Sequence, residues 1–493
     1  MEKKKVIVIG SGFAGLSAAC FMAKEGYAVT LLEKNNSAGG RARKFEAAGF
    51  LFDMGPSWYW MPDVFERFFA QFDKKATDYY HLIRLNPSYQ VIYSQHEKWN
   101  IPKDIEDLAI MLEQIEIGAA NKLKLFLAEA SVKYEVGMKD LVFKPGRSLS
   151  EFMSIDFFKG LLKLDLFTSH SQHVRKYFTN PKIISLLEFP VLFLGAKPQD
   201  TPALYSLMNY ADIQLGTWYP LGGMYKIVEG MVELATSLGV EIKYNQAVTG
   251  FNTKSGRVEA VKTADVNYDC DIVIAGADYH HIDQEVLSLP NRNYTAAYWD
   301  KRTMAPSSLL FYIGIDKKIV GLQHHNLFFD EDFGKHAIEI YDHPQWPSKP
   351  LFYVCCPSVT DPLVAPAGKE NLFILIPVAP GIEDNDQIRE KYFNIVMDRL
   401  ETLIGQSIRP HIVYKRSYAH KNFMEDYNSF KGNAYGLANT LKQTAILKPS
   451  IKSKKLNNLY FTGQLTVPGP GVPPSLISGE VVAKEIIKNL ARN

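Results

Sequence analysis

The stretch that decides the fold is Val6–Gly15, which reads Val-Ile-Val-Ile-Gly-Ser-Gly-Phe-Ala-Gly. Its apolar start predicts a buried strand over residues 5–9, and the glycine turn leads into a predicted helix over residues 15–25. A second apolar run, Ala28–Glu33, predicts another strand. Strand, glycine turn, helix and strand together make a βαβ unit, so the chain opens with part of a parallel sheet.

The glycine spacing Gly-x-Gly-x-x-Gly, placed between a strand and a helix, is typical of turns that bind the pyrophosphate of a dinucleotide. Gly10 permits the tight turn, Gly12 lets a phosphate approach the backbone, and Gly15 lets helix and strand pack closely. Free N–H groups at the helix N-terminus would stabilise the phosphate charge. Glu33 is placed to accept hydrogen bonds from an adenosine ribose, and an acid here argues against a 2′-phosphate.

Two segments that follow indicate which dinucleotide is bound. Ser37–Ala42 resembles the second dinucleotide motif of the FAD-dependent amine oxidase and carotenoid desaturase superfamily. Its paired glycines let the backbone pass beside the phosphates, and Arg41 supplies a charge-assisted donor. Asp53–Trp58 resembles the loop of the same superfamily that lies beside the flavin ring.

The C-terminal end carries a second glycine-rich motif that is expected to bind the cofactor. A predicted strand over residues 458–462 leads to Gly463, which is expected close to the ribityl phosphate. The run Pro468–Ser475 is too rich in proline and glycine for a strand or a helix interior, so it predicts a rigid loop against the isoalloxazine. A final helix over residues 475–490 would aim its positive end at the ring. The two ends of the chain are therefore expected to enclose the same flavin.

Over nearly its full length the sequence resembles the bacterial and fungal-type phytoene desaturases. Besides the glycine motifs, the resemblance rests on Thr217–Met224 and Ala275–Asp278. It implies a noncovalently bound FAD, a C40 polyene substrate, hydride transfer from the polyene to flavin N5, and peripheral attachment to a membrane. It also implies that Val248 holds the adenine through its main chain. The residues expected to bind FAD are Gly10, Gly12, Phe13, Ala14, Gly15, Glu33, Lys34, Gly39, Gly40, Arg41, Ala42, Gly55, Pro56, Ser57, Val248, Gly463, Gln464, Gly471, Val472 and Pro473.

The predicted fold class is α/β, with a discontinuous Rossmann-like FAD domain of the glutathione-reductase type and an α+β substrate domain. Residues 1–86, 224–289 and 442–493 are assigned to the FAD domain, and 87–223 and 290–441 to the substrate domain. The middle FAD segment predicts a helix, a small meander and a returning strand. The second insertion predicts strands at 308–315, 351–355 and 372–377 and a helix over 386–404.

A polyene has no polar handle, so its binding depends on burial of apolar surface. Tyr205, Trp218 and Tyr219, in the aromatic first insertion, are predicted to contact it, with a position in the core as the alternative for each. The proton acceptor is unknown. Asp212 is a weak candidate, with an ordinary surface carboxylate as the alternative. Phe152–Phe167 mixes apolar residues with lysines, which fits either an interfacial membrane helix or a core helix.

Composition excludes several classes. A net charge of +2 over 493 residues creates no strong positive electrostatic field that would favour binding of nucleic acid. Four cysteines are too few for a disulfide framework. No apolar run is long enough to span a bilayer, and no metal site is expected. We expect a cytoplasmic protein on the inner face of the cell membrane. Without a second nucleotide fingerprint, oxygen or a quinone is the expected electron acceptor.

The sequence leaves several activities open. Phytoene desaturation toward lycopene is the first prediction. A carotenoid cis-trans isomerase, a desaturase or ketolase of a later carotenoid, and a flavin amine oxidase are the alternatives. Cys356 is the last cysteine, so a thioether to the flavin near the C-terminal motif is excluded.

Overall fold

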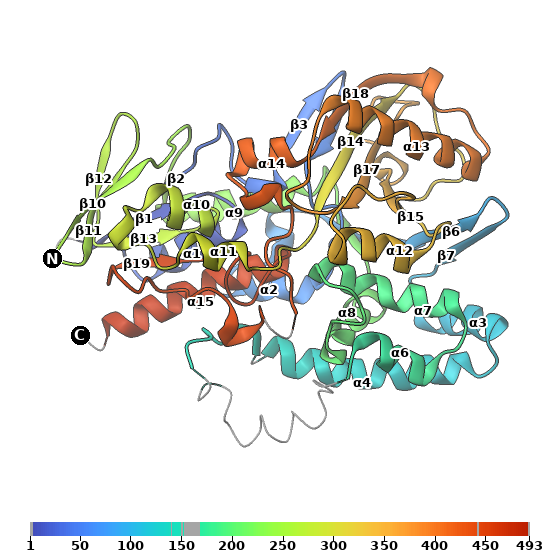
Figure 1. The fold of residues 1–493 in the computed structure, drawn as a ribbon, viewed down its shortest axis with the longest axis horizontal. Helices are drawn as coiled ribbons and strands as arrows, with labels where there is room; N and C mark the ends of the chain where they lie inside the picture. Colours follow the sequence, from blue (N-terminus) through green and yellow to red (C-terminus); the bar gives the residue numbers. More distant parts are fainter. Residues whose placement is uncertain (1–2, 140, 149–150, 152–167, 441–442, 492–493) are drawn as a thin grey trace.

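The computed structural model describes residues 3–139, 141–148, 151, 168–440 and 443–491. Two sheets dominate it, one at each end of the long axis, and both termini lie at the same end (Figure 1). The sheet near the termini is parallel and five-stranded, in the order β19-β13-β1-β2-β9. Its strands are β1 (Lys5–Ile9), β2 (Ala28–Leu32), β9 (Glu241–Lys243), β13 (Ile272–Ala275) and β19 (Leu459–Phe461). The first and last strands of the chain therefore belong to one sheet.

Alternate residues of β1 face opposite sides of this sheet. Val6 and Val8 pack with the helices α1 (Phe13–Lys24), α9 (Tyr225–Ser237) and α15 (Val472–Leu490). Ile7 and Ile9 pack on the other side with β11 of a three-stranded antiparallel sheet, β10 (Gly250–Lys254), β11 (Arg257–Lys262) and β12 (Asn267–Asp269). The sheet is thus buried on both faces, which explains the continuous apolar sequence of β1.

The first and last long helices pack in direct contact. A Cβ on Gly479 of α15 would lie 2.3 Å from the carbonyl oxygen of Ala14 in α1, so no larger residue fits at this crossing. This close approach brings the N-termini of the two helices to the same edge of the parallel sheet.

The second sheet is seven-stranded, in the order β18-β14-β17-β16-β15-β6-β7. One of its faces is covered by α13 (Asp386–Ile404), whose Phe393, Val396 and Leu400 pack with Ile374 and Ile376. Its strands are β6 (Tyr89–Ser94), β7 (Glu97–Ile101), β14 (Ser307–Ile315), β15 (His325–Phe328), β16 (Phe352–Cys355), β17 (Glu370–Val378) and β18 (Ile412–Tyr418). All seven strands come from residues 87–223 and 290–441.

A helical layer lies beneath the second sheet in the view of Figure 1. It contains α3 (Ile105–Ile115), α4 (Ala119–Lys139), α6 (His170–Tyr177), α7 (Pro181–Glu188) and α8 (Leu207–Asn209). The remaining elements are α2 (Pro62–Ala70), α10 (Tyr279–His281), α11 (Ala296–Asp300), α12 (Phe333–Ala337), α14 (His420–Tyr427), β3 (Lys44–Ala47), β4 (Phe50–Asp53), β5 (Leu82–Arg84) and β8 (Trp218–Pro220).

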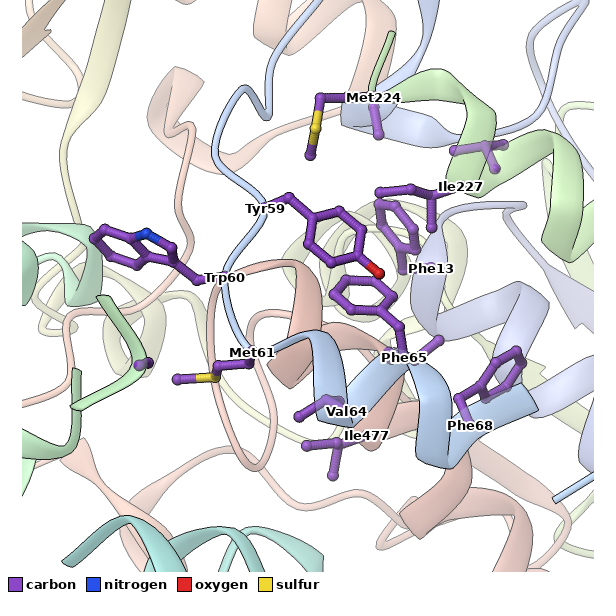
Figure 2. Close-up of a cluster of buried hydrophobic side chains, with 14 of the residues drawn as sticks. Phe13, Tyr59, Trp60, Met61, Val64, Phe65, Phe68, Met224, Ile227 and Ile477 are labelled. Atoms are coloured by element: carbon purple, nitrogen blue, oxygen red, sulfur yellow. The ribbon is translucent and has the colours of Figure 1, made fainter. Parts of the chain in front are cut away.

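The segment before α2 lies between the hydrophobic core and a cavity inside the molecule. Tyr59 points toward Phe13 and Phe65, and its ring stacks on Phe65 with centroids 4.5 Å apart, whereas Trp60 points to the opposite side (Figure 2). Extended backbone alternates its side chains in this way. One residue therefore anchors the segment in the core, and its neighbour is presented to the cavity described below.

The predicted α/β fold class is confirmed, and the helix expected over residues 386–404 is present with those bounds. Several boundaries differ from the prediction by one or two residues, as for α1, which begins at Phe13 instead of residue 15, and the start of the last helix differs most. The last helix begins at Val472, three residues before the predicted start, because Pro473 and Pro474 occupy the first turn, where a missing N–H costs nothing. Phe152–Phe167 lies outside the described residues. The proposed domain boundaries stay a prediction. Among the described residues, no helix is long and apolar enough to cross a membrane.

Candidate active site

One cavity of about 830 Å³ runs between the two sheets. Its lining includes residues of the N-terminal glycine turn, of the C-terminal proline-glycine loop, and of the seven-stranded sheet. The volume lies in the upper part of the range found for ligand sites, which is about 300–1,000 Å³. The two ends of the chain therefore enclose one common space, as the sequence predicts.

The glycine turn forms one end of this cavity. Gly10 has a φ of +92°, which favours glycine. A Cβ on Gly12 would meet nothing within 4 Å, so its backbone is open to the cavity. Gly15 does not line the cavity. A Cβ there would lie 1.9 Å from the carbonyl oxygen of Gly10, so its role is the close packing of helix on turn. No side chain caps α1, which leaves its first N–H groups available to an anion.

Glu33 lines the cavity beside this turn and is almost fully buried. Its Oε2 accepts hydrogen bonds from the Ser11 amide at 2.9 Å and the Ser11 hydroxyl at 2.6 Å. Its Oε1 accepts from the backbone amide of Asn35 at 2.9 Å and from its side chain at 3.0 Å. These bonds fix the carboxylate at the end of β2, where the sequence predicts a ribose partner.

Arg41 supplies a partly buried cation to the same region. One Nη donates to the Ser429 hydroxyl at 2.9 Å, whereas Nε is buried without a hydrogen-bond partner among the described residues. Burial lowers the pKa of Arg41, and Asp278 opposes that effect. A guanidinium with a buried, unused donor beside a helix N-terminus fits a phosphate oxygen. Lys34 also lines the cavity, but its ammonium donates to the Glu425 carbonyl at 2.6 Å.

Two loops close over the middle of the cavity. Gly55, Pro56 and Ser57 line it, and a Cβ on Gly55 would lie 2.5 Å from the Arg41 carbonyl oxygen. Opposite them, Gly471 caps α15 with a φ of +109°, and no side chain caps that helix. The residues that follow, including Val472 and Pro473, also line the cavity. The positive end of α15 therefore faces the same space as that of α1.

The far part of the cavity is apolar, and we call it the apolar half. On β17, Phe373, Leu375 and Pro377 face it, and the intervening Ile374 and Ile376 face α13. The described residues lining this half include no Asp, Glu, Lys or Arg. They are Phe189, Leu192, Met208, Leu327, Phe329, Phe333, His336, Ala337, Ile340, Tyr341, Leu351, Phe352, Tyr353, Phe373, Leu375 and Pro377.

The predicted cofactor residues gather around one space. All of them except Gly15 line the cavity, Val248 and Gln464 included. The predicted substrate residues Tyr205, Trp218 and Tyr219 do not belong to the described lining. Trp218 donates to the Leu215 carbonyl at 2.8 Å, and Tyr219 to Asp361 at 3.2 Å. The second insertion supplies most of the aromatic lining instead. Side chains alternate between the two faces of a strand, so the sequence would identify these lining residues only if the face toward the cavity were known.

Asp212 is not a surface carboxylate, so that interpretation was wrong. It is 2% exposed and accepts hydrogen bonds from Tyr89 at 2.8 Å and Thr217 at 3.4 Å. Burial raises its pKa to about 7. It does not line the cavity; Trp60, which does, donates to Thr217 at 2.8 Å. Asp212 therefore supports the cavity wall from behind through Thr217.

The residues present fit FAD. At one end the cavity offers the uncapped N-terminus of α1, an unused guanidinium donor and an unobstructed glycine backbone. These groups match a pyrophosphate. The loops in the middle match a flavin ring held by backbone, and the apolar half leaves room for a substrate.

Comparison with known proteins agrees with this geometry. Residues 13–487 match the model of the flavin containing amine oxidoreductase family. The chain is 41% identical to the carotenoid 3,4-desaturase of Haloarcula japonica, over 100% of this chain and 99% of that protein. It is 31% identical to the 4,4'-diapophytoene desaturase (4,4'-diaponeurosporene-forming) of Staphylococcus aureus, over 99% of both chains.

Solved structures show the same fold at low sequence identity. An oxidoreductase from Methanosarcina mazei aligns with a TM-score of 0.64 at 16% identity, over 97% of this chain and 100% of that one. Cyclohexylamine oxidase from Brevibacterium oxydans aligns with a TM-score of 0.61 at 14% identity, over 99% and 100%. The predicted resemblance and the FAD cofactor are confirmed. The chain belongs to the flavin containing amine oxidoreductase family and is an FAD-dependent oxidoreductase that acts on CH–CH groups.

Proposed function

We propose that this protein is a carotenoid desaturase, which forms a C=C bond in a polyene held in the apolar half of the cavity. One observation carries the proposal: the cavity joins the end formed by the glycine turn directly to an end lined by apolar and aromatic side chains. Burial of apolar surface stabilises a bound hydrocarbon by about 25 cal/mol per Å². An ammonium substrate would instead call for an acid, and no described Asp or Glu lines the apolar half.

The roles of the residues follow from their positions. We propose that the glycine turn, Arg41 and Glu33 hold the adenosine diphosphate part of FAD, and that Val248 holds the adenine. Gly55–Ser57 and Gly471–Pro473 would position the flavin, with the N-terminus of α15 stabilising negative charge on it. FAD, when bound, supplies the hydride acceptor. The apolar half excludes water and aligns the polyene against the ring.

Two substrates are candidates. The 41% relative is named for desaturation at the 3,4 position, which supports a later carotenoid such as lycopene as the substrate. The sequence predicts phytoene and its conversion toward lycopene, and the 31% relative, named for diapophytoene, supports an early polyene. We propose the later carotenoid as the first candidate, because the identity to the first relative is higher.

Pigment spectra distinguish these candidates. The chain should be expressed in cells that accumulate lycopene and in cells that accumulate phytoene. Desaturation of lycopene lengthens the conjugated system, so the expected result is a red-shifted pigment in the first cells and no colour in the second. Coloured product from phytoene alone would favour the early substrate. Conversion of a cis-carotene without a change in hydrogen content would indicate an isomerase, and no conversion in any strain contradicts desaturation.

We also propose peripheral attachment to a membrane and reoxidation by oxygen or a quinone. The substrate is lipid-soluble, and Leu125 and Val132, seven residues apart on α4, are 54% and 42% exposed. Replacing both with Lys should weaken flotation with liposomes, because charged residues bury less readily among acyl chains. The matched control is Lys at Val413, which is 48% exposed on β18. Equal flotation of both variants would remove α4 from the lipid contact.

A further inference from the structure

A cluster of polar side chains sits at the junction between the flavin loop and the apolar half. It comprises Ser57, His325 and Tyr353, with Trp58 packed against it, and we call it the junction cluster. Ser57, Trp58 and Tyr353 line the cavity. His325 lies one layer behind them and is 0% exposed. The proposed function gives Ser57 a place beside the flavin but leaves His325 and Tyr353 without a role, and it also lacks an acceptor for the proton that desaturation releases.

The cluster is held by strand register and stacking. His325 of β15 lies opposite Cys355 of β16, two residues after Tyr353. The Tyr353 hydroxyl donates to Ser57 Oγ at 3.1 Å, and its oxygen lies 2.5 Å from Nδ1 of His325. The His325 ring stacks on Trp58 with centroids 4.0 Å apart and planes 10° apart. Ser57 and Trp58 belong to the loop proposed to contact the flavin, so the cluster is tied to the ring position.

The one titratable hydrogen of Tyr353 has Ser57, His325 and the Cys355 thiol within reach. A hydroxyl hydrogen rotates about its C–O bond, so it can turn from Ser57 to Nδ1 of His325. Nε2 of His325 is buried and has no hydrogen-bond partner among the described residues. The imidazole is therefore held at Nδ1 by the Tyr353 hydroxyl, whereas Nε2 makes no hydrogen bond among the described residues.

His336, which lines the apolar half directly, is not equivalent to His325. His336 Nδ1 accepts from the Leu351 amide at 3.1 Å, and its Nε2 lies 3.0 Å from the Pro377 carbonyl oxygen. A carbonyl accepts only, so Nε2 must carry the proton, and both ring nitrogens are committed to backbone. His336 consequently has no lone pair to offer a substrate, whereas the Tyr353 hydroxyl lines the cavity and has the imidazole of His325 behind it.

We propose that Tyr353, backed by His325, is the proton acceptor of the desaturation, an inference that rests on the proposed function. Bound FAD would supply the acceptor for a hydride, with its electron pair, from one carbon of the polyene. The neighbouring carbon loses a proton to the Tyr353 oxygen while the phenolic proton moves to Nδ1 of His325. The C–H electron pair becomes the second bond of the new C=C. The substrate has then lost two hydrogens, and His325 carries one positive charge.

The physical setting suits this transfer. A polyene cation is a strong acid, so a weak neutral base suffices. Burial holds the pKa of His325 well below its usual value, so the imidazole is neutral before the reaction and short-lived as a cation after it. Tyr353 touches the substrate space and is the catalytic residue of the pair. His325 acts through it and is a positioning residue.

The test uses full-length, FAD-loaded Tyr353→Phe and His325→Asn, because Asn keeps a polar group near the position of Nδ1. Tyr392→Phe is the matched control, since Tyr392 is a buried tyrosine whose hydroxyl donates to the Pro347 carbonyl at 2.7 Å, away from the cavity. Anaerobic flavin reduction is followed with lycopene and with phytoene in liposomes. Tyr353→Phe and His325→Asn should reduce the flavin about 100-fold more slowly at saturation. Their FAD content and apparent substrate affinity should stay within about twofold, as in the control.

A second readout does not depend on turnover. In ¹⁵N-histidine NMR of the apoprotein, one neutral imidazole signal should shift in Tyr353→Phe and stay in place in Tyr392→Phe. Reduction at the wild-type rate in both cluster variants, or an unchanged NMR signal, overturns the assignment. If His325→Asn does not fold, Tyr353→Phe decides alone. A wild type that reduces its flavin with neither carotenoid overturns the proposed function and this role together, whereas conversion by wild type and variants alike overturns only the role.

Discussion

Gly12→Asp is expected to give a folded but colourless protein that binds FAD about 100-fold more weakly or worse. Gly12 has ordinary extended φ and ψ values of −72° and 176°, and a Cβ there meets nothing within 4 Å. An aspartate therefore fits without strain. It would occupy the N-cap of α1 and accept from the free N–H groups that the pyrophosphate needs. Its negative charge would also repel the phosphates.

The Gly12→Asp variant is informative because it should weaken FAD binding without lowering the thermal stability of the apoprotein. An Asp at an N-cap stabilises a helix by about 1 kcal/mol over Ala, so the melting temperature of the apoprotein should not fall. Gly15→Ala is the contrasting variant, because its Cβ would lie 1.9 Å from the Gly10 carbonyl oxygen, and it should lower stability as well as FAD content. Flavin absorbance of the purified protein and thermal melting measure both quantities. A yellow, fully loaded Gly12→Asp protein would contradict the pyrophosphate assignment.

Leu375→Lys is expected to abolish carotenoid conversion, by about 100-fold or more in kcat/KM, while FAD content stays close to that of the wild type. Leu375 faces the apolar half of the cavity from the middle of β17. An ammonium there must either remain charged among apolar side chains or draw water into the cavity, and both disfavour a hydrocarbon ligand. Leu375 pairs with Leu310 and Tyr353 in the seven-stranded sheet and not with the glycine turn, so the cofactor should remain.

Leu375→Met is the matched control, because the two side chains have similar volume and Met adapts to irregular space. It should retain conversion within a few-fold. Steady-state conversion in liposomes and flavin absorbance are the measurements. If Leu375→Lys converts the carotenoid at the wild-type rate, the substrate does not occupy the space beside β17.

The cofactor end of the site could be predicted from sequence because its signals are local. Val6–Gly15 contains a strand, a turn and a helix start within ten residues. The role of each glycine follows from this local motif and needs no knowledge of the tertiary structure. The C-terminal loop is similar, since proline and glycine leave few conformations for it. Its one error, the late start of α15, came from treating proline as a helix breaker in a first turn, where it is tolerated.

The substrate end could not be predicted in the same way. Residues 370–378 read Glu-Asn-Leu-Phe-Ile-Leu-Ile-Pro-Val, and a strand buried on both faces gives no alternation to show which residues face a cavity. The prediction of three substrate residues rests only on their aromatic type within the first insertion, namely Tyr205, Trp218 and Tyr219. The direction of a side chain there is set by packing, which residue type does not reveal. The junction cluster joins residues 57, 325 and 353, so no local motif could have found it.

The central claim is that a flavin and a polyene share one cavity closed by both ends of the chain. Anaerobic mixing of the FAD-loaded protein with lycopene in liposomes tests it most directly, with flavin and polyene absorbance recorded together. The account predicts that the flavin bleaches as the polyene spectrum shifts to the red, at the same rate and in equal amounts. A flavin that stays oxidised with lycopene and with phytoene but bleaches with an amine would contradict it.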